Sequence, residues 1–435
     1  MGVKGIIGLK LESAYNETIN LASPGTADWH HEASKASSKL NDEPVKMEGG
    51  SRASKGARAG YIKPTASFEG SVDLKRLGHY ILGALGNYVF TAGGTDANVH
   101  EFYGSNLSKL PSFRGYFYYD YFVKYLGGML VDGLKIESGG DDFASISADF
   151  IYANEKKDEV EEADFEEKEI DGAIPLMLYD LTVELDEISS ATDIIVSEVS
   201  LELKNNHNTD TINGASSRNV KKKATAQARE VTAEITTAME AEILELLTLT
   251  EYGEEDADEP SACKLYTGKL TITAQICENT EDKLTIILPS AIFTVEYESS
   301  GADEIEVKFK LDALSKGKVT LADETTEKVT DIYCKIENDQ PKIEATRTDA
   351  TIIVNVKDND TTPAAISGKI VTLKNKVSGT EYTSAATDAT GDATISNVPY
   401  GRYEVKVADK TVVSPKTTAI NEGTETVNIT VQKAT

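Results

Sequence analysis

The stretch MLVDGLKIESGGDDFASISADF (Met129–Phe150) decides the fold, because it aligns without gaps on SAIFTVEYESSGADEIEVKFKL (Ser290–Leu311). The offset between the two segments is 161 residues. Identical residues stand at Glu137 and Glu298, Ser138 and Ser299, Gly140 and Gly301, and Asp142 and Asp303. The same offset carries Ser71–Leu74 onto Thr232–Ile235, and each is followed by a helix-like run. A constant offset over two distant stretches indicates a duplicated domain.

Alternating apolar and polar residues predict a mainly-β chain. In the first copy we expect strands over 6–11, 61–74 and 113–125, and a hairpin of 129–136 with 143–152. A short amphipathic helix is expected over 75–85, ended by Gly86. The residues from 12 to 60 and from 87 to 111 show little periodicity, so we expect long loops there.

The second copy repeats this plan after the acidic run 155–169, which we expect to be a solvated connector. The helix is expected over 236–249, and polar loops over 205–223 and 252–260. The expected strands are 174–185, 194–203, 229–235, 265–276, 284–288, 291–298 and 304–311.

From about residue 343 the composition changes to short Ala-, Thr- and Val-rich strands with turn signals every eight to twelve residues. This pattern is typical of a small all-β sandwich. We therefore predict three parts: a first β-sandwich unit (1–155), a second one (156–342) and a C-terminal Ig-like sandwich (343–435), with one short helix flanking each of the first two.

Charge and composition narrow the function. The chain has 435 residues and a formal net charge of −28, which opposes affinity for nucleic acid because phosphate binding requires clustered cations. Its first residues lack the apolar stretch of a signal peptide, and no window reaches the length of a membrane span, so we expect assembly in the cytosol and no membrane partner.

No motif indicates catalysis, and we predict no catalytic, cofactor-binding or metal-binding residues, and no enzyme. Nucleophile-elbow, P-loop and dinucleotide-binding patterns are missing, and the five histidines lack the spacing of a metal triad (His30, His31, His79, His100 and His207). Three unpaired cysteines, Cys263, Cys277 and Cys334, are expected to be buried thiols.

Three further clusters have structural interpretations. Asp358–Asp360 lacks the glycine and distal glutamate of a calcium loop, so we expect an Asx-turn. The aromatic run from Phe113 to Tyr125 could stack bases, but one face of a strand is needed for the core, which favours core and subunit interface. Lys221–Lys223 is expected to be a solvated loop or to face an acidic loop of a neighbour.

Several of these segments resemble major tail tube proteins of tailed viruses. The resemblance rests on GLKLESAY (Gly8–Tyr15), on FEGSVDL (Phe68–Leu74) before a short helix, on the long loop, and on the hairpin around Ser138–Asp141. It covers roughly residues 1 to 340. It implies a β-sandwich that forms rings, whose inner sheets join into a barrel and whose rings stack into a DNA-conducting tube in the virion.

The duplication then implies homotrimeric rings with pseudo-sixfold symmetry, and hexameric rings are the alternative. Expected partners are the chain itself and other tail proteins (terminator, tape measure, baseplate or tip). Viral DNA would pass through the lumen without specific binding. We expect a net negative channel wall, with candidate carboxylates in 230–235 and 304–311.

The segment TDATGDATISNVPYGRYEVKV (Thr387–Val407) is similar to prealbumin-like repeats of bacterial surface adhesins. Such modules often carry a Lys–Asn isopeptide bond, and Lys374 with Asn428 is a conceivable pair, although no central carboxylate is evident and we expect both at the surface. On a tail, this domain would decorate the outside. Two rival functions remain: a multi-domain surface adhesin, which would need a signal peptide and an anchor, and a hydrolase using Asp/Glu pairs.

Overall fold

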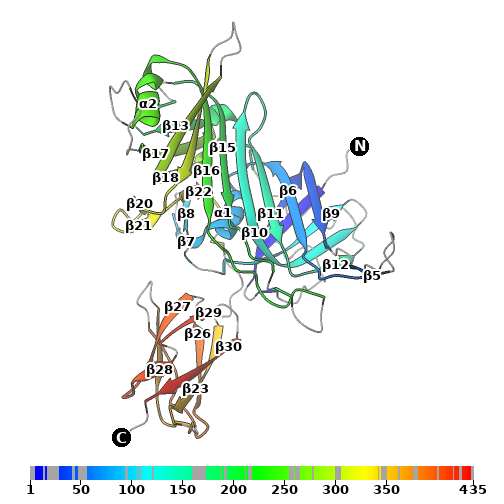
Figure 1. The fold of residues 1–435 in the computed structure, drawn as a ribbon, viewed down its shortest axis with the longest axis vertical. Helices are drawn as coiled ribbons and strands as arrows, with labels where there is room; N and C mark the ends of the chain where they lie inside the picture. The colour runs from blue at the N-terminus through cyan, green and yellow to red at the C-terminus, as the bar shows by residue number, and fades with distance from the viewer. Residues whose placement is uncertain are drawn as a thin grey trace. The chain divides into compact units, whose positions relative to one another are not determined.

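The structure is a computed structural model, and its described residues contain thirty strands and two α-helices, which confirms the mainly-β prediction (Figure 1). They group into two compact units, one drawn from 1–11 and 18–343 and the other from 12–17 and 344–435. The structure describes residues 5–12, 15–16, 29–41, 45–47, 56–93, 97–104, 106, 109–119, 122–158, 173–186, 188–190, 194–210, 212–213, 218–253, 259, 265–276, 279–298, 305–340, 342–343, 350–360, 363–375, 381–398, 401–414, 416–420 and 424–432.

A sheet of eight antiparallel strands dominates the first unit (Figure 1). Apolar residues alternate with polar ones, as along β19, where Val307 and Phe309 are buried and Lys308 is exposed. The strands follow the order β3 (Lys35–Lys39), β6 (Thr65–Ser71), β11 (Ser145–Ile151), β10 (Val123–Gly139), β15 (Val196–Lys204), β16 (Glu230–Ala238), β19 (Glu306–Ala313) and β18 (Asn279–Glu298).

Strands β10 and β18 are so long that the first half of each pairs with other strands outside the eight-stranded sheet. The first half of β10 joins the order β2 (Trp29–Ala33), β1 (Gly5–Leu11), β9 (Phe113–Tyr119), β10, β12 (Asn154–Asp158). The first half of β18 joins the order β14 (Ile188–Ser189), β13 (Leu181–Leu185), β17 (Thr267–Ile276), β18, β22 (Tyr333–Asn338), β8 (Asn98–Gly104), β7 (Gly86–Thr91). Gly128 in β10, at a φ of 66°, and Pro289 in β18 stand between the two halves of their strands.

The two helices have different environments. Every residue of α1 (Leu77–Leu85) is buried, and the helix ends at Gly86, which has a φ of 85° and donates its N–H to Leu82 O. The predicted helix end is thereby confirmed. In α2 (Ala241–Tyr252), Ile243, Leu246 and Leu247 are buried and others are exposed, as expected for an amphipathic surface helix. The remaining elements are η4 (Leu178–Asp180) and two hairpins, β4 (Val45–Met47) with β5 (Gly56–Arg58) and β20 (Gly317–Thr320) with β21 (Glu327–Thr330).

The second unit contains two four-stranded sheets around one apolar core of Val, Ile and Leu side chains. One sheet has the order β26 (Asp392–Val398), β23 (Ala350–Asp358), β30 (Thr424–Val431), β28 (Val412–Ser414), and its β23–β30 pair is parallel. The other has the order β25 (Glu381–Thr383), β24 (Val371–Asn375), β27 (Gly401–Val407), β29 (Thr417–Ile420). Lys374 and Glu381 form an ion pair of 3.7 Å and Asn428 is exposed, so both predicted isopeptide residues lie at the surface.

Several predicted elements are wrong. The aromatic run 113–125 is not one strand, because the chain reverses between Tyr119 and Val123 and the two arms pair as β9 and β10. The expected loop 87–111 contains the hairpin β7–β8. The expected loop 12–60 contains β2 and β3, whose partners β1 and β6 lie elsewhere in the sequence. No strand was predicted over 312–341, where β20, β21 and β22 lie.

The predicted division between residues 155 and 156 stays a prediction, since strands on its two sides share one sheet through the β10–β15 pair. The acidic run is described only to Asp158, where Asn154–Asp158 forms β12; its remainder lies outside the described residues.

Candidate functional site: the seam between the two repeats

The eight-stranded sheet consists of two equivalent groups of four strands. The pair Gly133↔Asp149 of β10 and β11 matches Thr294↔Lys310 of β18 and β19, and both strands keep the offset of 161. Five consecutive pairs agree in this way, from Gly133↔Asp149 to Glu137↔Ser145 in the first group. The duplicated hairpins therefore share one register.

Strands β6 and β16, which pair with these hairpins, are also equivalent, but their offset is not 161 residues. Asp149 faces Ser67 of β6 as Lys310 faces Glu234 of β16, so Ser67 corresponds to Glu234. The predicted match of Ser71–Leu74 with Thr232–Ile235 is thus wrong, because these pairings place Thr232 at the position of Thr65. The offset of β6 and β16 differs by six residues from that of the hairpins. The reason is that the chain between equivalent positions of β6 and β10, which includes α1 and the β7–β8 hairpin, is six residues longer than the chain between the matching positions of β16 and β18.

One step further along the sheet, β3 corresponds to β15. Ser67 faces Ser37, and Glu234 faces Ser200, so Ser37 corresponds to Ser200. The first group therefore has the order β3-β6-β11-β10 and the second β15-β16-β19-β18. The groups meet head to tail, since β10 ends the first and β15 begins the second.

This β10–β15 seam has an apolar face and a charged face. On the core side Leu134 lies opposite Leu203, and both are buried. On the other side Lys135 lies opposite Glu202. On the core side of the seam, helix α1 and strands of both groups contribute side chains to one small apolar cavity. It is lined by Ile81, Leu85, Leu134, Ile136, Leu201, Leu203, Ile286, Ile332 and Cys334. The two groups thus share a hydrophobic core.

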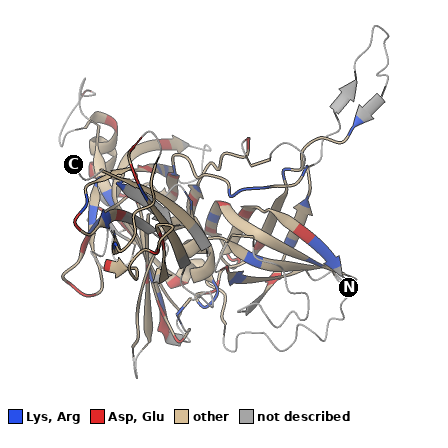
Figure 2. Ribbon diagram, turned by 90° about the horizontal axis from the view of Figure 1, so that it is seen from below, with Lys and Arg blue, Asp and Glu red and all other residues tan. Residues whose placement is uncertain are grey.

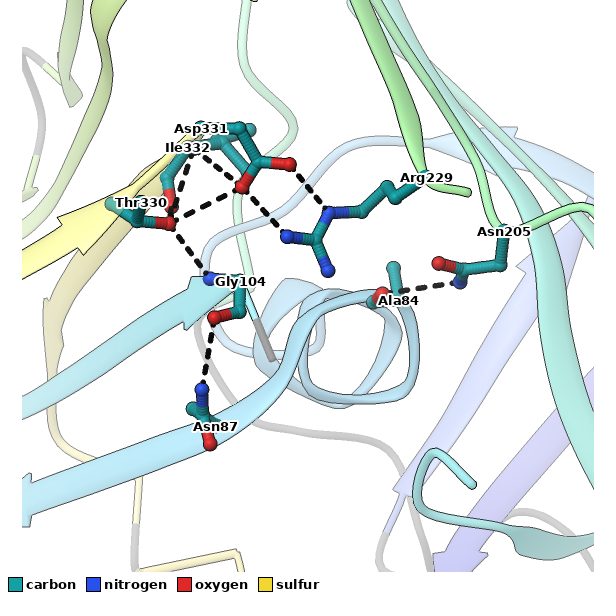
Figure 3. A network of polar contacts seen from close by, with 8 residues as sticks. All are labelled: Ala84, Asn87, Gly104, Asn205, Arg229, Thr330, Asp331 and Ile332. Carbon is teal, nitrogen blue, oxygen red and sulfur yellow. Dashed lines mark hydrogen bonds and ion pairs between the residues drawn. The ribbon is translucent and has the colours of Figure 1, made fainter. Parts of the chain in front are cut away.

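A largely buried ion pair of the second repeat, between Arg229 and Asp331, lies on one side of α1 (Figure 3). The Arg229 guanidinium donates Nε to Asp331 Oδ2 at 2.8 Å and Nη2 to Asp331 Oδ1 at 2.7 Å. The side chains are 12% and 9% exposed, respectively. This bidentate geometry is the strongest arrangement available to Arg and a carboxylate. Asp331 also accepts a hydrogen bond from Ile332 N at 3.0 Å, so its charge is well compensated.

Through Thr330, the ion pair is connected to the β7–β8 hairpin of the first repeat (Figure 3). Gly104 N donates to Thr330 Oγ1 at 3.0 Å, and Asn87 Nδ2 donates to Gly104 O at 3.0 Å. A Cβ atom at Gly104 would lie 2.0 Å from Arg229 Nη2. Glycine at this position therefore permits the close approach of the guanidinium to β8.

Asn205, at the end of β15, bridges three elements (Figure 3). Its buried Nδ2 donates to Ala84 O of α1 at 3.1 Å and to Val131 O of β10 at 2.9 Å. The Ala84 carbonyl lies in the last helical turn, whose carbonyls have no partner within the helix. Asn205 thus satisfies a helix end of one group from a strand of the other.

His207 extends this contact to Asp132 of β10. Its backbone N–H donates to Asp132 Oδ1 at 2.8 Å, and its Nδ1 lies 2.9 Å from the same oxygen. Burial of Asp132 alone would raise the pKa of this carboxyl, but the hydrogen bonds from His207 outweigh it and the pKa is lowered. Glu101 of β8 is a buried carboxylate, and it accepts hydrogen bonds from Tyr333 Oη at 2.7 Å and from Ala322 N at 2.7 Å.

The polar face of the eight-stranded sheet carries more acids than bases. Four of its lysines form ion pairs with neighbouring acids: Lys35 with Glu69, Lys135 with Glu137, Lys204 with Glu202, and Lys308 with Glu234. Charged residues run along the strands (Figure 2). On this face the described side chains include six lysines (35, 39, 135, 204, 308 and 310) and ten acids (69, 137, 149, 198, 202, 230, 234, 296, 306 and 312).

The residues singled out in the sequence do not converge on one site. His31 is buried beside α1, His100 bonds Gln340 O, and His207 belongs to the seam. Within the described residues, no group of His, Cys, Asp and Glu could hold a metal ion. Cys334 is a buried free thiol, and burial raises its pKa. Cys263 and Cys277 lie outside the described residues, as do residues 211 and 214–217 of the 205–223 loop.

Sequence reasoning missed the seam residues Asn205, Arg229 and Asp331. Their partners lie far away in the sequence, so no local spacing could reveal them; a polar Asn-Asn-His run directly after a predicted strand was the only signal. No helix of the described residues is long and apolar enough to cross a membrane. No protein-family model matches the chain, and no curated protein matches it.

Proposed function

We propose that this chain is a structural subunit that joins copies of itself into rings, and that it serves as the major tail tube protein of a tailed virus. The observation that carries the proposal is the β10–β15 seam, at which two equivalent four-stranded groups meet head to tail within one chain. Head-to-tail contacts between equivalent units generate closed rings when the rotation closes.

The two ends of the eight-stranded sheet support this proposal. In the described part of the chain, β3 pairs only with β6, and residues 294–298 of β18 pair only with β19. A sheet edge presents unpaired backbone groups that can template another strand. Since β3 is equivalent to β15 and β18 to β10, these two edges are the halves of a second seam.

The charge of the polar face agrees with a channel for DNA. Its excess of acids over lysines would repel phosphate along the wall rather than bind it. Glu230, Glu234 and Glu306, which lie in the two predicted candidate segments, belong to this face. Stacked rings would deliver viral DNA through the tail of a virion, with other tail proteins at the two ends of the tube.

Electron microscopy of the purified full-length chain tests the proposal. The net charge of −28 opposes association, so the protein should be imaged at low and at high ionic strength, where screening weakens the repulsion. We expect rings or tubes with a central channel. A chain that stays monomeric at high concentration in both conditions would contradict the proposed function.

A further inference from the structure

We infer that β18 of one chain pairs with β3 of the next chain in a single register, in which Glu296 stands opposite Lys39. This inference rests on the proposed function and specifies its contact. The register follows from the internal seam. Lys135 of β10 faces Glu202 of β15, Glu296 is equivalent to Lys135, and Lys39 is equivalent to Glu202.

On its charged face, the second seam also places opposite charges across from each other. Each strand, however, carries the opposite sign from its equivalent in the internal seam. The internal seam places a lysine of β10 opposite a glutamate of β15. The inferred seam places the glutamate on β18 and the lysine on β3. Glu296 and Lys39 are both exposed in the isolated chain. Opposite charges directly across an antiparallel pair stabilise it, and like charges destabilise it.

The core-side face matches as well. In the inferred register Val295 lies opposite Leu40, as Leu134 lies opposite Leu203 in the internal seam. Val295 and Leu40 are only half-buried in the isolated chain. The next residue on this face, Tyr297, is 55% exposed although its equivalent in β10 lies at the shared core. A neighbouring β3 would cover this apolar edge.

A disulfide between the two edges tests the register. We would combine Lys39→Cys with Glu296→Cys in a chain that also carries Cys263→Ser and Cys277→Ser. The two edges are seven strand spacings apart in one chain, about 34 Å, so a disulfide between them can form only between chains. Under mild oxidation we expect covalent oligomers on a non-reducing gel. The control pairs Lys39→Cys with Thr294→Cys, which lies on the same face but diagonally, at about 7 Å between Cβ atoms, too far for a disulfide.

Charge reversal provides a second test that does not depend on disulfide geometry. Glu296→Lys alone should raise the protein concentration needed for assembly at low salt by about fivefold, because two lysines then face each other. Adding Lys39→Glu should restore assembly to within about twofold of the original chain. Asp149→Lys, an equal change of charge on the same face but distant from both edges, is the control and should leave assembly closer to that of the original chain.

The outcomes separate the two proposals. Crosslinking by the predicted pair and restoration by the double reversal support the register. Rings that crosslink through the diagonal pair, or a double reversal that assembles no better than the single one, would overturn the register while leaving the proposed function in place. An original chain that never assembles would overturn the proposed function, and this inference with it.

Discussion

Arg229 and Asp331 are the residues through which the second repeat holds the β7–β8 hairpin of the first. Removing one partner of such a buried pair leaves the other charge uncompensated, which costs far more than the pair contributes. We expect Arg229→Leu to lower the free energy of unfolding by about 3 kcal/mol. Urea unfolding measures this, with Arg58→Leu at an exposed site as the control. If both variants unfold at the same urea concentration, the seam does not depend on this pair.

His31 gives the chain a predictable response to acid. Its Nε2 donates to Ser71 O at 2.8 Å, and its Nδ1 lies 3.2 Å from Tyr80 Oη, an arrangement that suits a neutral ring. Burial lowers the pKa of His31 from 6.5 to about 4; Asp73 and Glu32 oppose this shift and Arg76 adds to it.

Because the folded pKa lies below the unfolded one, the unfolded chain binds more protons between pH 6.5 and pH 4. The contribution of His31 to stability is therefore present near pH 7 and decreases as the pH falls through this window. We expect the original chain to lose about 1–2 kcal/mol more than His31→Gln between pH 7 and pH 5. Equal losses in urea unfolding at the two pH values would contradict the neutral buried histidine.

At the scale of elements, the sequence predicted strands, turns and helix ends whose signals lie within a few residues. It missed pairings between segments that are far apart in the sequence. The hairpin around Gly140, the helix before Gly86 and most strands of the C-terminal sandwich follow from alternation, turn residues and caps within a few positions. The seam could not be predicted in this way. Strand β8 pairs with β7 in a local hairpin, but its other partner, β22, lies more than 200 residues away in the sequence.

The sequence revealed the duplication but not the correct alignment of every strand of the two copies. The hairpin β10–β11 keeps its offset because its turn fixes the register of both strands. Strands β6 and β16 are separated from that hairpin by a connection that differs between the copies, so their offset is not the same. Polar contacts such as Asn205 with Ala84 become visible only when the sheet brings both copies together.

The C-terminal unit should be dispensable for ring formation. It has its own apolar core, built from strands between Ala350 and Val431, and it has no equivalent in the repeated part of the sequence. A chain ending at Glu344 is therefore expected to form tubes with an unchanged channel and a smaller outer diameter. Electron microscopy beside the full-length chain measures both diameters. A truncated chain that stays monomeric where the full chain assembles would show that this unit is needed for the ring contacts.

At the scale of the whole molecule, we propose that one chain supplies two of the equivalent groups that surround a channel. If six groups surround the axis, as the resemblance to tail tube proteins implies, three chains close the ring, with internal and inter-chain seams in alternation. The two groups differ in sequence and in the connection after the helix, so the ring can be sixfold only in outline. Symmetry analysis of assembled rings by electron cryo-microscopy tests this claim most directly. We predict threefold symmetry with two similar but distinct sandwich units per chain, and six chains related by true sixfold symmetry would contradict it.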